Sequence, residues 1–158
     1  MKVCFISLKA YPLFKSDVKA MHGGAEVQMS ILAKHLAEND KFDVHVITAK
    51  YKNSGKEKVE NITIWPSFNF LLFTFFKIIR FLKVFNKVNA DIYIQRTLTL
   101  YSFFLAKYCH MRKKKFIYMV AHDNELNGRE RLFRYPFGRY LIKGMYKNAS
   151  AVIVQNNY

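Results

Sequence analysis

The sequence holds few cysteines, few glycines and prolines, and no linker of biased composition. Its two cysteines, Cys4 and Cys109, are too few for a disulfide framework or a zinc cluster. The six glycines and three prolines are scattered, so no Pro/Gly-rich segment divides the 158 residues. With 51% hydrophobic residues, the composition predicts one globular domain over residues 1–158.

Acidic residues are scarce as well, and the resulting net charge indicates which partners the protein can bind. Lys and Arg number 26 against 11 Asp and Glu, which gives a net charge of +15. Such a charge favours anionic partners, which include nucleic acid, a membrane surface and phosphorylated ligands.

The sequence also lacks a secretory signal and a long apolar run. Met-Lys leads directly into a strand-like run, without the apolar core and cleavage site of a signal peptide. The most apolar window, residues 68–85, is interrupted by Lys77, Arg80 and Lys83, which argues against a helix that spans a bilayer. We therefore expect a cytoplasmic protein, and peripheral binding to the inner face of the plasma membrane stays open.

Two phosphate-binding motifs are missing. The absence of GxGxxG disfavours a dinucleotide-dependent dehydrogenase. The absence of GxxxxGK followed by Ser or Thr disfavours a nucleoside triphosphatase.

What is present is an alternation of strand-like and helix-like segments. The strand-like runs are apolar at consecutive positions, as in strands buried on both faces of a parallel sheet. They cover residues 3–8, 44–48, 62–65, 92–95, 116–120 and 152–155. Helical segments are expected at residues 25–38, 69–87, 98–110 and 137–148. This order predicts a doubly wound, mostly parallel α/β sheet in a Rossmann-like three-layer domain.

Two further local patterns carry predictions. In the segment 25–38, an apolar stripe at helical spacing predicts a helix packed on the sheet; it consists of Met29, Leu32, Ala33 and Leu36. The polar stretch 50–60 predicts an exposed connection, with its turn at Asn53-Ser54-Gly55.

Candidate binding residues follow the strand-like runs, because open parallel sheets bind ligands at the carboxyl ends of their strands. Gly23 and Gly24 precede the first long helix, where unpaired N–H groups and the helix dipole favour an anion such as a diphosphate. Simple loop flexibility is the alternative explanation for this glycine pair. Arg96 follows the run 92–95 and is a second candidate.

His122 and Asp123 directly follow the run 116–120 and form a third candidate group. A histidine at a strand end is more often a structural hydrogen-bonding group than a catalytic one, and both roles stay open for His122. Asp123 and Glu125 are not expected to act as a carboxylate pair, because alternate residues of an extended segment point in opposite directions. The other four histidines have no metal-ligand spacing and are expected to be structural.

Together these segments resemble the N-terminal half of glycosyltransferase family 4. The resemblance is carried by the order of VCFISL, GGAEVQMSILAKHLAE, FDVHVIT, VAHDNE and YLIKGMYKNASAVIVQNN. It implies a GT-B enzyme with two Rossmann-like domains, of which this chain is the acceptor-side domain. By this resemblance we expect the chain to lack the C-terminal donor-binding domain and to be inactive alone.

The resemblance also implies substrates and roles for residues. A retaining glycosyltransferase of hexosyltransferase type would transfer a sugar from a UDP- or GDP-linked nucleotide-sugar to a glycan or lipid-linked acceptor, in cell-envelope polysaccharide synthesis. It would need no metal and no cofactor. Gly23 and Gly24 match the glycine loop near the donor diphosphate, and His122 matches the strand-end histidine at the transferred sugar. Asp123 and Arg96 are expected to contribute to substrate binding.

The segment 69–87 supports a further hypothesis. On a helical wheel, the arc expected to be buried holds Phe81, Phe85, Ile78, Leu71, Leu82, Phe75 and Ile79. The other arc mixes Phe73, Phe76 and Val84 with four basic residues, which suits the surface of an anionic membrane. Burial of these phenylalanines under a neighbouring loop is the alternative.

The competing function is a basic, non-catalytic α/β binding module for nucleic acid or an anionic membrane. Nucleic acid is the less favoured partner, because no recognised nucleic-acid motif is present and the aromatic residues fall mostly in runs expected to be buried.

Overall fold

The computed structural model describes residues 1–51, 54–126 and 137–154. The chain divides into two compact units, Met1–Asp91 and Ile92–Tyr158, which we call the first and the second unit. The prediction of a single domain over residues 1–158 stays a prediction.

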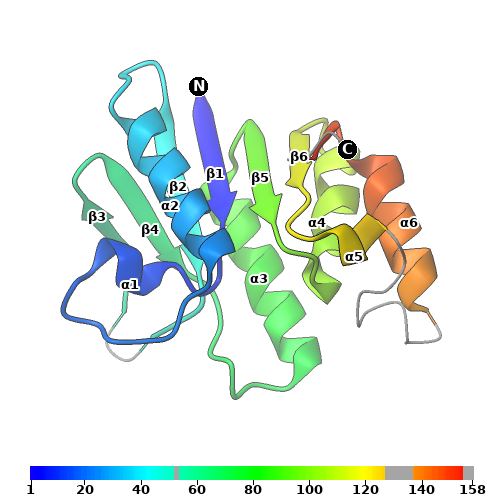
Figure 1. Cartoon of the computed structure of the whole chain (residues 1–158), viewed down its shortest axis with the longest axis horizontal. Coiled ribbons are helices and arrows are strands. Elements are labelled where there is room, and N and C mark those ends of the chain that lie inside the picture. Colours follow the sequence, from blue (N-terminus) through cyan, green and yellow to red (C-terminus); the bar gives the residue numbers. More distant parts are fainter. Residues whose placement is uncertain (52–53, 127–136, 155–158) are drawn as a thin grey trace. The chain divides into compact units, whose positions relative to one another are not determined.

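The first unit contains a sheet of four strands, β1 (Lys2–Ile6), β2 (Asp43–Thr48), β3 (Glu57–Val59) and β4 (Ile62–Pro66), in the order β3-β4-β2-β1. The strands β1, β2 and β4 pair in parallel, and β3 adds an antiparallel edge (Figure 1). Consecutive residues of β1 and β2 are buried, as the unbroken apolar runs predicted.

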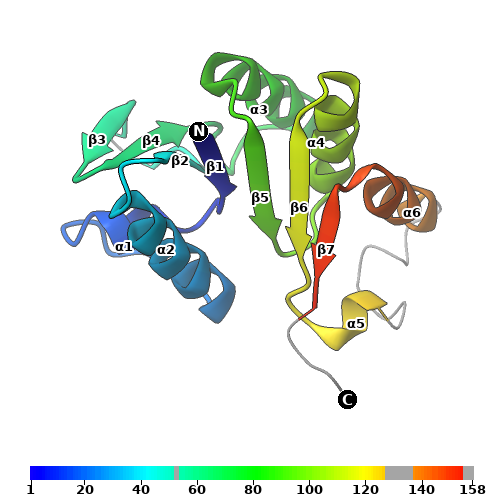
Figure 2. The same ribbon diagram turned by 90° about the horizontal axis from the view of Figure 1, so that it is seen from above.

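Helices cover both faces of this sheet. The short α1 (Tyr11–Phe14) and the long α2 (Gly24–Ala37) lie on one face, and α3 (Thr74–Val88) lies on the other (Figure 2). On α2 the buried residues are Met29, Ser30, Ala33 and Ala37. Leu32, expected in the buried stripe, is 38% exposed instead, so that part of the prediction is wrong.

The helix α3 begins later than the apolar pattern indicated. Asn69 forms a turn, in which its Oδ1 accepts a hydrogen bond from the Leu71 amide at 3.0 Å and its carbonyl accepts one from the Leu72 amide. An Asn side chain that bonds the backbone two residues on offers an alternative to the helix. The first helical residue is therefore Thr74 rather than Asn69.

The burial of α3 differs from the wheel in the same region. Phe81, Phe85 and Val88 are buried. Leu71 and Phe75 were expected on the buried arc, but their exposed fractions are 91% and 67%. Both lie before or within the first helical turn, where the buried arc of the helix has not yet reached its packing partners.

The second unit contains β5 (Ile92–Arg96), β6 (Lys115–Met119) and β7 (Ala151–Ile153), paired in parallel in that order. Its helices are α4 (Leu100–Met111), α5 (Asp123–Leu126) and α6 (Gly138–Asn148). The helices α4 and α6 lie side by side (Figures 1 and 2). Their contact is close at Gly144, where an added Cβ would lie 2.5 Å from a ring carbon of Phe103.

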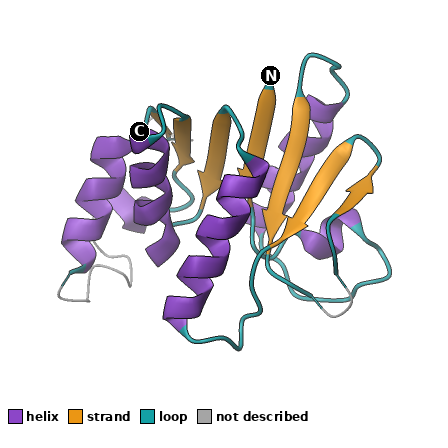
Figure 3. Cartoon of the chain, turned by 180° about the vertical axis from the view of Figure 1, so that it is seen from behind, coloured by secondary structure: helices purple, strands orange, loops and turns teal. Residues whose placement is uncertain are grey.

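The predicted fold class is confirmed. The chain is an α/β protein with mostly parallel strands and Rossmann-like alternation of strands and helices, and Figure 3 shows this alternation. One strand was missed: residues 57–59 lie within the stretch expected to be an exposed connection, and they form β3. Of the turn predicted there, Asn53 lies outside the described residues.

Among the helices in the described part of the chain, none combines the length and the apolarity needed to cross a bilayer.

Candidate functional site

The second unit brings three of the predicted site residues to one edge of its sheet. Arg96 is the last residue of β5 and is buried, with 8% of its surface exposed. It is paired in register with Met119, the last residue of β6. His122 follows three residues later and is exposed, and Asp123 begins α5. This is the carboxyl edge of parallel strands, where ligands of such sheets bind.

A buried carboxylate holds the segment that carries His122. Glu125 is only 2% exposed, and its Oε2 accepts hydrogen bonds from the Tyr118 hydroxyl at 2.8 Å and the Ala121 amide at 3.2 Å. The Glu125 amide in turn donates to the His122 carbonyl at 3.0 Å. These bonds tie α5 to the end of β6 and leave the His122 side chain exposed.

The sequence pattern does not by itself indicate this hydrogen-bonding role for Glu125. The segment 123–126 is a short helix rather than an extended strand, so the argument from alternating directions does not apply. Burial raises the pKa of the neighbouring Tyr146, and the Glu125 charge raises it further. In the sequence, the one sign of the hydrogen bonds to Glu125 is the position of a Glu three residues after a strand-end His.

Hydrogen bonds within the loop after β5 also fix its conformation. Gln95 is 3% exposed, and its Nε2 donates to the Thr97 carbonyl and to the Thr99 Oγ1, each at 3.3 Å. Thr97 has φ 78°, a left-handed conformation that costs free energy for a β-branched residue. Thr99 then caps α4, with its amide donating to the Ser102 hydroxyl at 2.9 Å. Arg96 therefore stands at the start of a strained, well-bonded turn.

The first unit carries the other two predicted residues at the start of α2. Gly23 is the N-cap with φ −108°, and its amide donates to Glu26 Oε2 at 2.9 Å. Gly24 is the first helical residue, and a Cβ added to it would meet no described atom within 4 Å. Both glycines are exposed. Neither the local backbone nor steric contact within the described chain therefore requires glycine at position 24.

The charge at this helix start is partly balanced. The Glu26 carboxylate lies at the amino end of α2, where the helix dipole stabilises negative charge. The amides of the first turn after Gly23 have no acceptor within the helix itself, as in any α-helix. An anion approaching the helix start would bond these amides rather than the amide of Gly23.

A hollow of about 540 Å³ adjoins the glycine pair. Its lining is formed by α1 and the loop before α2, and consists of Pro12, Val18, Lys19, Ala20, Met21 and His22. A second hollow of about 670 Å³ lies between this loop and β3. There, the Tyr11 hydroxyl donates to Glu57 Oε1 at 2.6 Å, and Lys15 Nζ lies 2.9 Å from Glu57 Oε2.

Two polar side chains of this second hollow, Tyr11 and Lys15, share Glu57 as their partner. Burial and the hydrogen bond to Glu57 raise the pKa of Tyr11 to about 12. The hydrogen bond from Tyr11 holds the pKa of Glu57 below its ordinary value, and the bond to Glu57 raises the pKa of Lys15. Tyr51 stacks on Tyr11, with ring centroids 5.3 Å apart. These contacts explain why the loop after β1 lies against β3.

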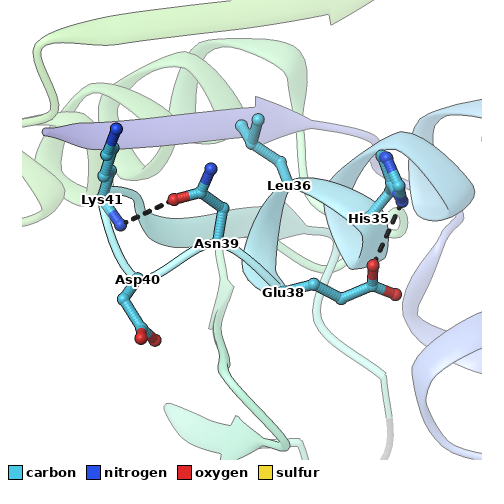
Figure 4. A pocket seen from close by; sticks show the side chains of 6 residues that line it. All are labelled: His35, Leu36, Glu38, Asn39, Asp40 and Lys41. Carbon is cyan, nitrogen blue, oxygen red and sulfur yellow. Dashed lines mark hydrogen bonds and ion pairs between the residues drawn. The ribbon is translucent and has the colours of Figure 1, made fainter.

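A third hollow of about 640 Å³ lies at the opposite end of α2 (Figure 4). It is lined by residues 35–41 without Ala37, and its bonds are local: His35 Nδ1 to Glu38 Oε2 at 3.2 Å, and the Lys41 amide to Asn39 Oδ1 at 3.0 Å. This hollow adjoins the amino end of β2, whereas ligands of parallel sheets bind at carboxyl ends. We do not assign a site to it.

His45 has a structural role, as expected. Its Nδ1 accepts a hydrogen bond from Trp65 Nε1 at 2.9 Å, which places the proton on Nε2, 2.9 Å from Asp43 Oδ2. The contact with His45 Nε2 holds the pKa of Asp43 below its ordinary value. In the ranges that the structure describes, no three His, Cys, Asp or Glu side chains gather as metal ligands.

The fold and the edge at which polar residues gather define the class of protein: a Rossmann-like α/β chain with its candidate site at the carboxyl ends of the strands. A model of the family described as Glycosyltransferase Family 4 matches residues 22–158. The chain belongs to this family. No curated protein sequence matches it.

Family membership confirms the coarse functional prediction. The chain is a glycosyltransferase-family domain, and its family implies a sugar donor and an acceptor as substrates. All five predicted site residues lie within the matched range, which begins at His22, whereas β1 and the loop after it precede the match. The roles of Gly23, Gly24, Arg96, His122 and Asp123 remain predictions.

Proposed function

We propose that the chain is the acceptor-side domain of a retaining glycosyltransferase of hexosyltransferase type. Its donor is a UDP- or GDP-linked nucleotide-sugar, and its acceptor is a glycan or a lipid-linked glycan of cell-envelope polysaccharide synthesis. The protein acts in the cytoplasm and uses neither a metal nor another cofactor. Membership of glycosyltransferase family 4 is the starting point for this proposal.

One observation carries the assignment of the site. Gly24 is glycine where the chain's own geometry does not demand it, because an added Cβ would meet no described atom within 4 Å. A small residue at an exposed helix start suits a ligand that approaches the backbone closely. The amides of the first turn of α2 then face the donor diphosphate, and the positive end of the helix dipole stabilises it.

His122 is the second residue to which we assign a role in the reaction. Its side chain is exposed at the carboxyl edge of the second unit, on a segment fixed by Glu125. In the proposed reaction, it hydrogen-bonds the transferred sugar and the acceptor hydroxyl. Arg96 and Asp123 contribute to substrate binding from the same edge. The leaving diphosphate is stabilised electrostatically while the acceptor attacks from the same face.

The proposed cleft needs a second wall. We infer that a donor-binding domain of the same polypeptide supplies it, so the 158-residue chain alone binds nucleotide-sugars weakly and transfers no sugar. Titration calorimetry of the chain with UDP- and GDP-sugars checks this. Micromolar affinity of the chain alone would contradict the division of roles between the domains.

Replacement of His122 in the polypeptide with both domains tests the reaction. We expect His122→Ala to lower the transfer rate about 100-fold and to leave donor affinity within about threefold, since the lost contact belongs to the reacting sugar. His110→Ala, at an exposed position on α4, is the matched control. Normal transfer by the His122 variant would place the reacting groups elsewhere.

A basic binding module for nucleic acid is the second candidate function, and the net charge of +15 is the observation that favours it. Gel-shift titrations with single-stranded RNA and duplex DNA at rising salt distinguish the two functions. Salt-sensitive nucleic-acid binding without any response to nucleotide-sugars would favour the module.

A further inference from the structure

The loop before α3 and its first turn expose a cluster of large apolar side chains. The exposed fractions are 44% for Phe70, 91% for Leu71, 81% for Phe73, 67% for Phe75 and 54% for Phe76. We call these five residues the phenylalanine surface. Single exposed apolar residues are common on soluble proteins, but five within seven positions are not, and such patches mark interaction sites.

The fold explains why these residues are exposed. The turn at Asn69 delays the start of α3, and Phe73 is the extended N-cap of the helix. The first fully buried residue of α3 is Phe81, whose ring lies 6.0 Å from that of Phe68 between centroids. The start of α3 extends past the carboxyl ends of the strands of its unit (Figure 1). The phenylalanine surface therefore projects from the sheet instead of covering it.

The charges next to this surface have one sign. Between residues 61 and 90 the sequence has four basic residues and no Asp or Glu; they are Lys77, Arg80, Lys83 and Lys87. Arg80, Lys83 and Lys87 are exposed, and Lys77 is half-buried. At about 100° per residue, these four positions share an arc of the helix with Phe73 and Phe76. The buried residues Phe81, Phe85 and Val88 lie on a different arc.

We propose that the phenylalanine surface and its four basic neighbours dock the protein on an anionic phospholipid bilayer. The cations meet lipid phosphates, and the phenylalanine rings enter the boundary between headgroups and acyl chains. A bilayer is favoured over a protein partner because the partner must offer apolar depth and negative charge side by side along the whole helix. It is favoured over nucleic acid because Leu71, the most exposed of the five residues, has no ring that could stack on a base.

This docking is independent of the catalytic proposal, since it uses none of the predicted site residues. It also places the carboxyl edge of the first unit, which carries Gly24, toward the lipid. If the proposed function holds, an acceptor anchored in the bilayer would be presented to that edge.

Vesicle sedimentation tests the charges. The full chain is mixed with vesicles of phosphatidylcholine containing about one third phosphatidylglycerol, and with vesicles of phosphatidylcholine alone. We expect binding to the anionic vesicles that weakens as salt rises. The triple variant K77E/R80E/K83E should bind at least about 100-fold more weakly, because each basic group near such a surface contributes roughly a fivefold factor.

A matched control separates this surface from overall charge. The variant K41E/K107E/K143E makes the same change in net charge at exposed positions outside α3 and the loop before it. We expect its vesicle binding to fall by less than about tenfold. Charges outside the contact surface attract the vesicle only from a distance, where salt screens the attraction. Equal losses in the two triple variants would overturn the proposal, because attraction would then depend on net charge alone.

A second set of variants tests the apolar contact. We expect L71S/F73S/F76S to reduce binding at least about tenfold, and to do so at high salt as well, since ring insertion is not screened. The control M21S/I31S/M111S removes exposed apolar side chains elsewhere and should bind as the unchanged chain does. Circular dichroism and thermal midpoints verify that all variants fold.

Other occupants of the surface would give different results. If the serine variant binds vesicles normally but changes the elution volume in size-exclusion chromatography, the surface joins two copies of the chain. If charge reversal abolishes a gel shift with RNA and leaves vesicle binding intact, the partner is nucleic acid. Either outcome would contradict docking on a bilayer.

Discussion

The segment around Gly24 and the segment around His122 both lie at carboxyl edges of parallel strands, and the chain constructs them in opposite ways. At Gly24 the backbone is an open helix start, and an added Cβ would meet no described atom within 4 Å. At His122 the backbone is tied down by Glu125, which is 2% exposed and accepts two hydrogen bonds. The fold dictates the second segment and leaves the first free to vary.

This difference separates two reasons for a residue's identity. Glu125 is needed by the fold, whatever the protein binds, because its loss removes the acceptor of a buried hydroxyl and an amide. Gly24 is not needed by the fold, so any requirement for glycine there comes from a ligand. Stability measurements and activity measurements should therefore respond to the two segments in opposite ways.

The largest effect on stability is expected at Glu125. Glu125→Ala should lower the free energy of unfolding by about 3 kcal/mol, since it leaves two donors without this acceptor and opens a small cavity. Urea unfolding followed by circular dichroism measures it. Glu38→Ala, at a side chain that is 72% exposed, should change the free energy by less than about 0.5 kcal/mol.

If Glu125→Ala lowers the free energy of unfolding only slightly, water replaces the carboxylate at little cost. The contrast with Gly24 would then disappear. Tyr118→Phe refines the result, because it removes one of the two hydrogen bonds and keeps the ring. A loss of about 1 kcal/mol is expected for that variant.

Gly24→Val should have a large effect on activity and a small one on stability. In the polypeptide with both domains, we expect the transfer rate at low donor concentration to fall about 100-fold, because the branched side chain blocks approach to the backbone. The thermal midpoint of the variant should stay close to that of the parent protein. Initial rates with UDP- and GDP-sugars, together with thermal unfolding, check both parts.

Gly55→Val is the matched control for this substitution. Gly55 is also exposed, and an added Cβ would likewise meet no described atom within 4 Å. Its transfer rate should stay within about twofold of the parent rate. Equal losses at Gly24 and Gly55 would show that valine disturbs loops in general and would remove the basis for a ligand at α2.

The order and type of most elements could be predicted because strands buried on both faces and a helix packed on a sheet leave clear apolar patterns. The runs at 44–48 and 116–120 became β2 and β6 with shifts of a single residue. The edge strand β3 could not be predicted, because Glu57-Lys58-Val59 carries two charges. It pairs with β4 because a two-residue turn, in which Glu60 has φ 52°, brings the two strands side by side.

The remaining features could not be predicted because they depend on packing and hydrogen-bonding partners elsewhere in the fold. The wheel treated Leu71 and Phe75 as helical and buried, but the turn at Asn69 and the projection of α3 beyond the strands exposed them. Sequence position was enough to place His122 at a strand end. It could not identify Glu125 as the buried group that fixes this segment, because that role depends on Tyr118, seven residues earlier, across a turn.

The smallest expected effect is that of Gly24→Ala on stability, and it tests whether the fold requires glycine at this position. The helix start at Gly24 has no left-handed φ, and the added methyl group meets no described atom. Alanine should therefore stabilise the chain by about 0.5 kcal/mol, since it restricts the unfolded chain more than glycine does and suits a helix better. A rise in the urea midpoint with an unchanged slope measures this gain. If alanine destabilises the chain instead, the fold itself requires glycine at this position, and the argument from Gly24 to an approaching ligand fails.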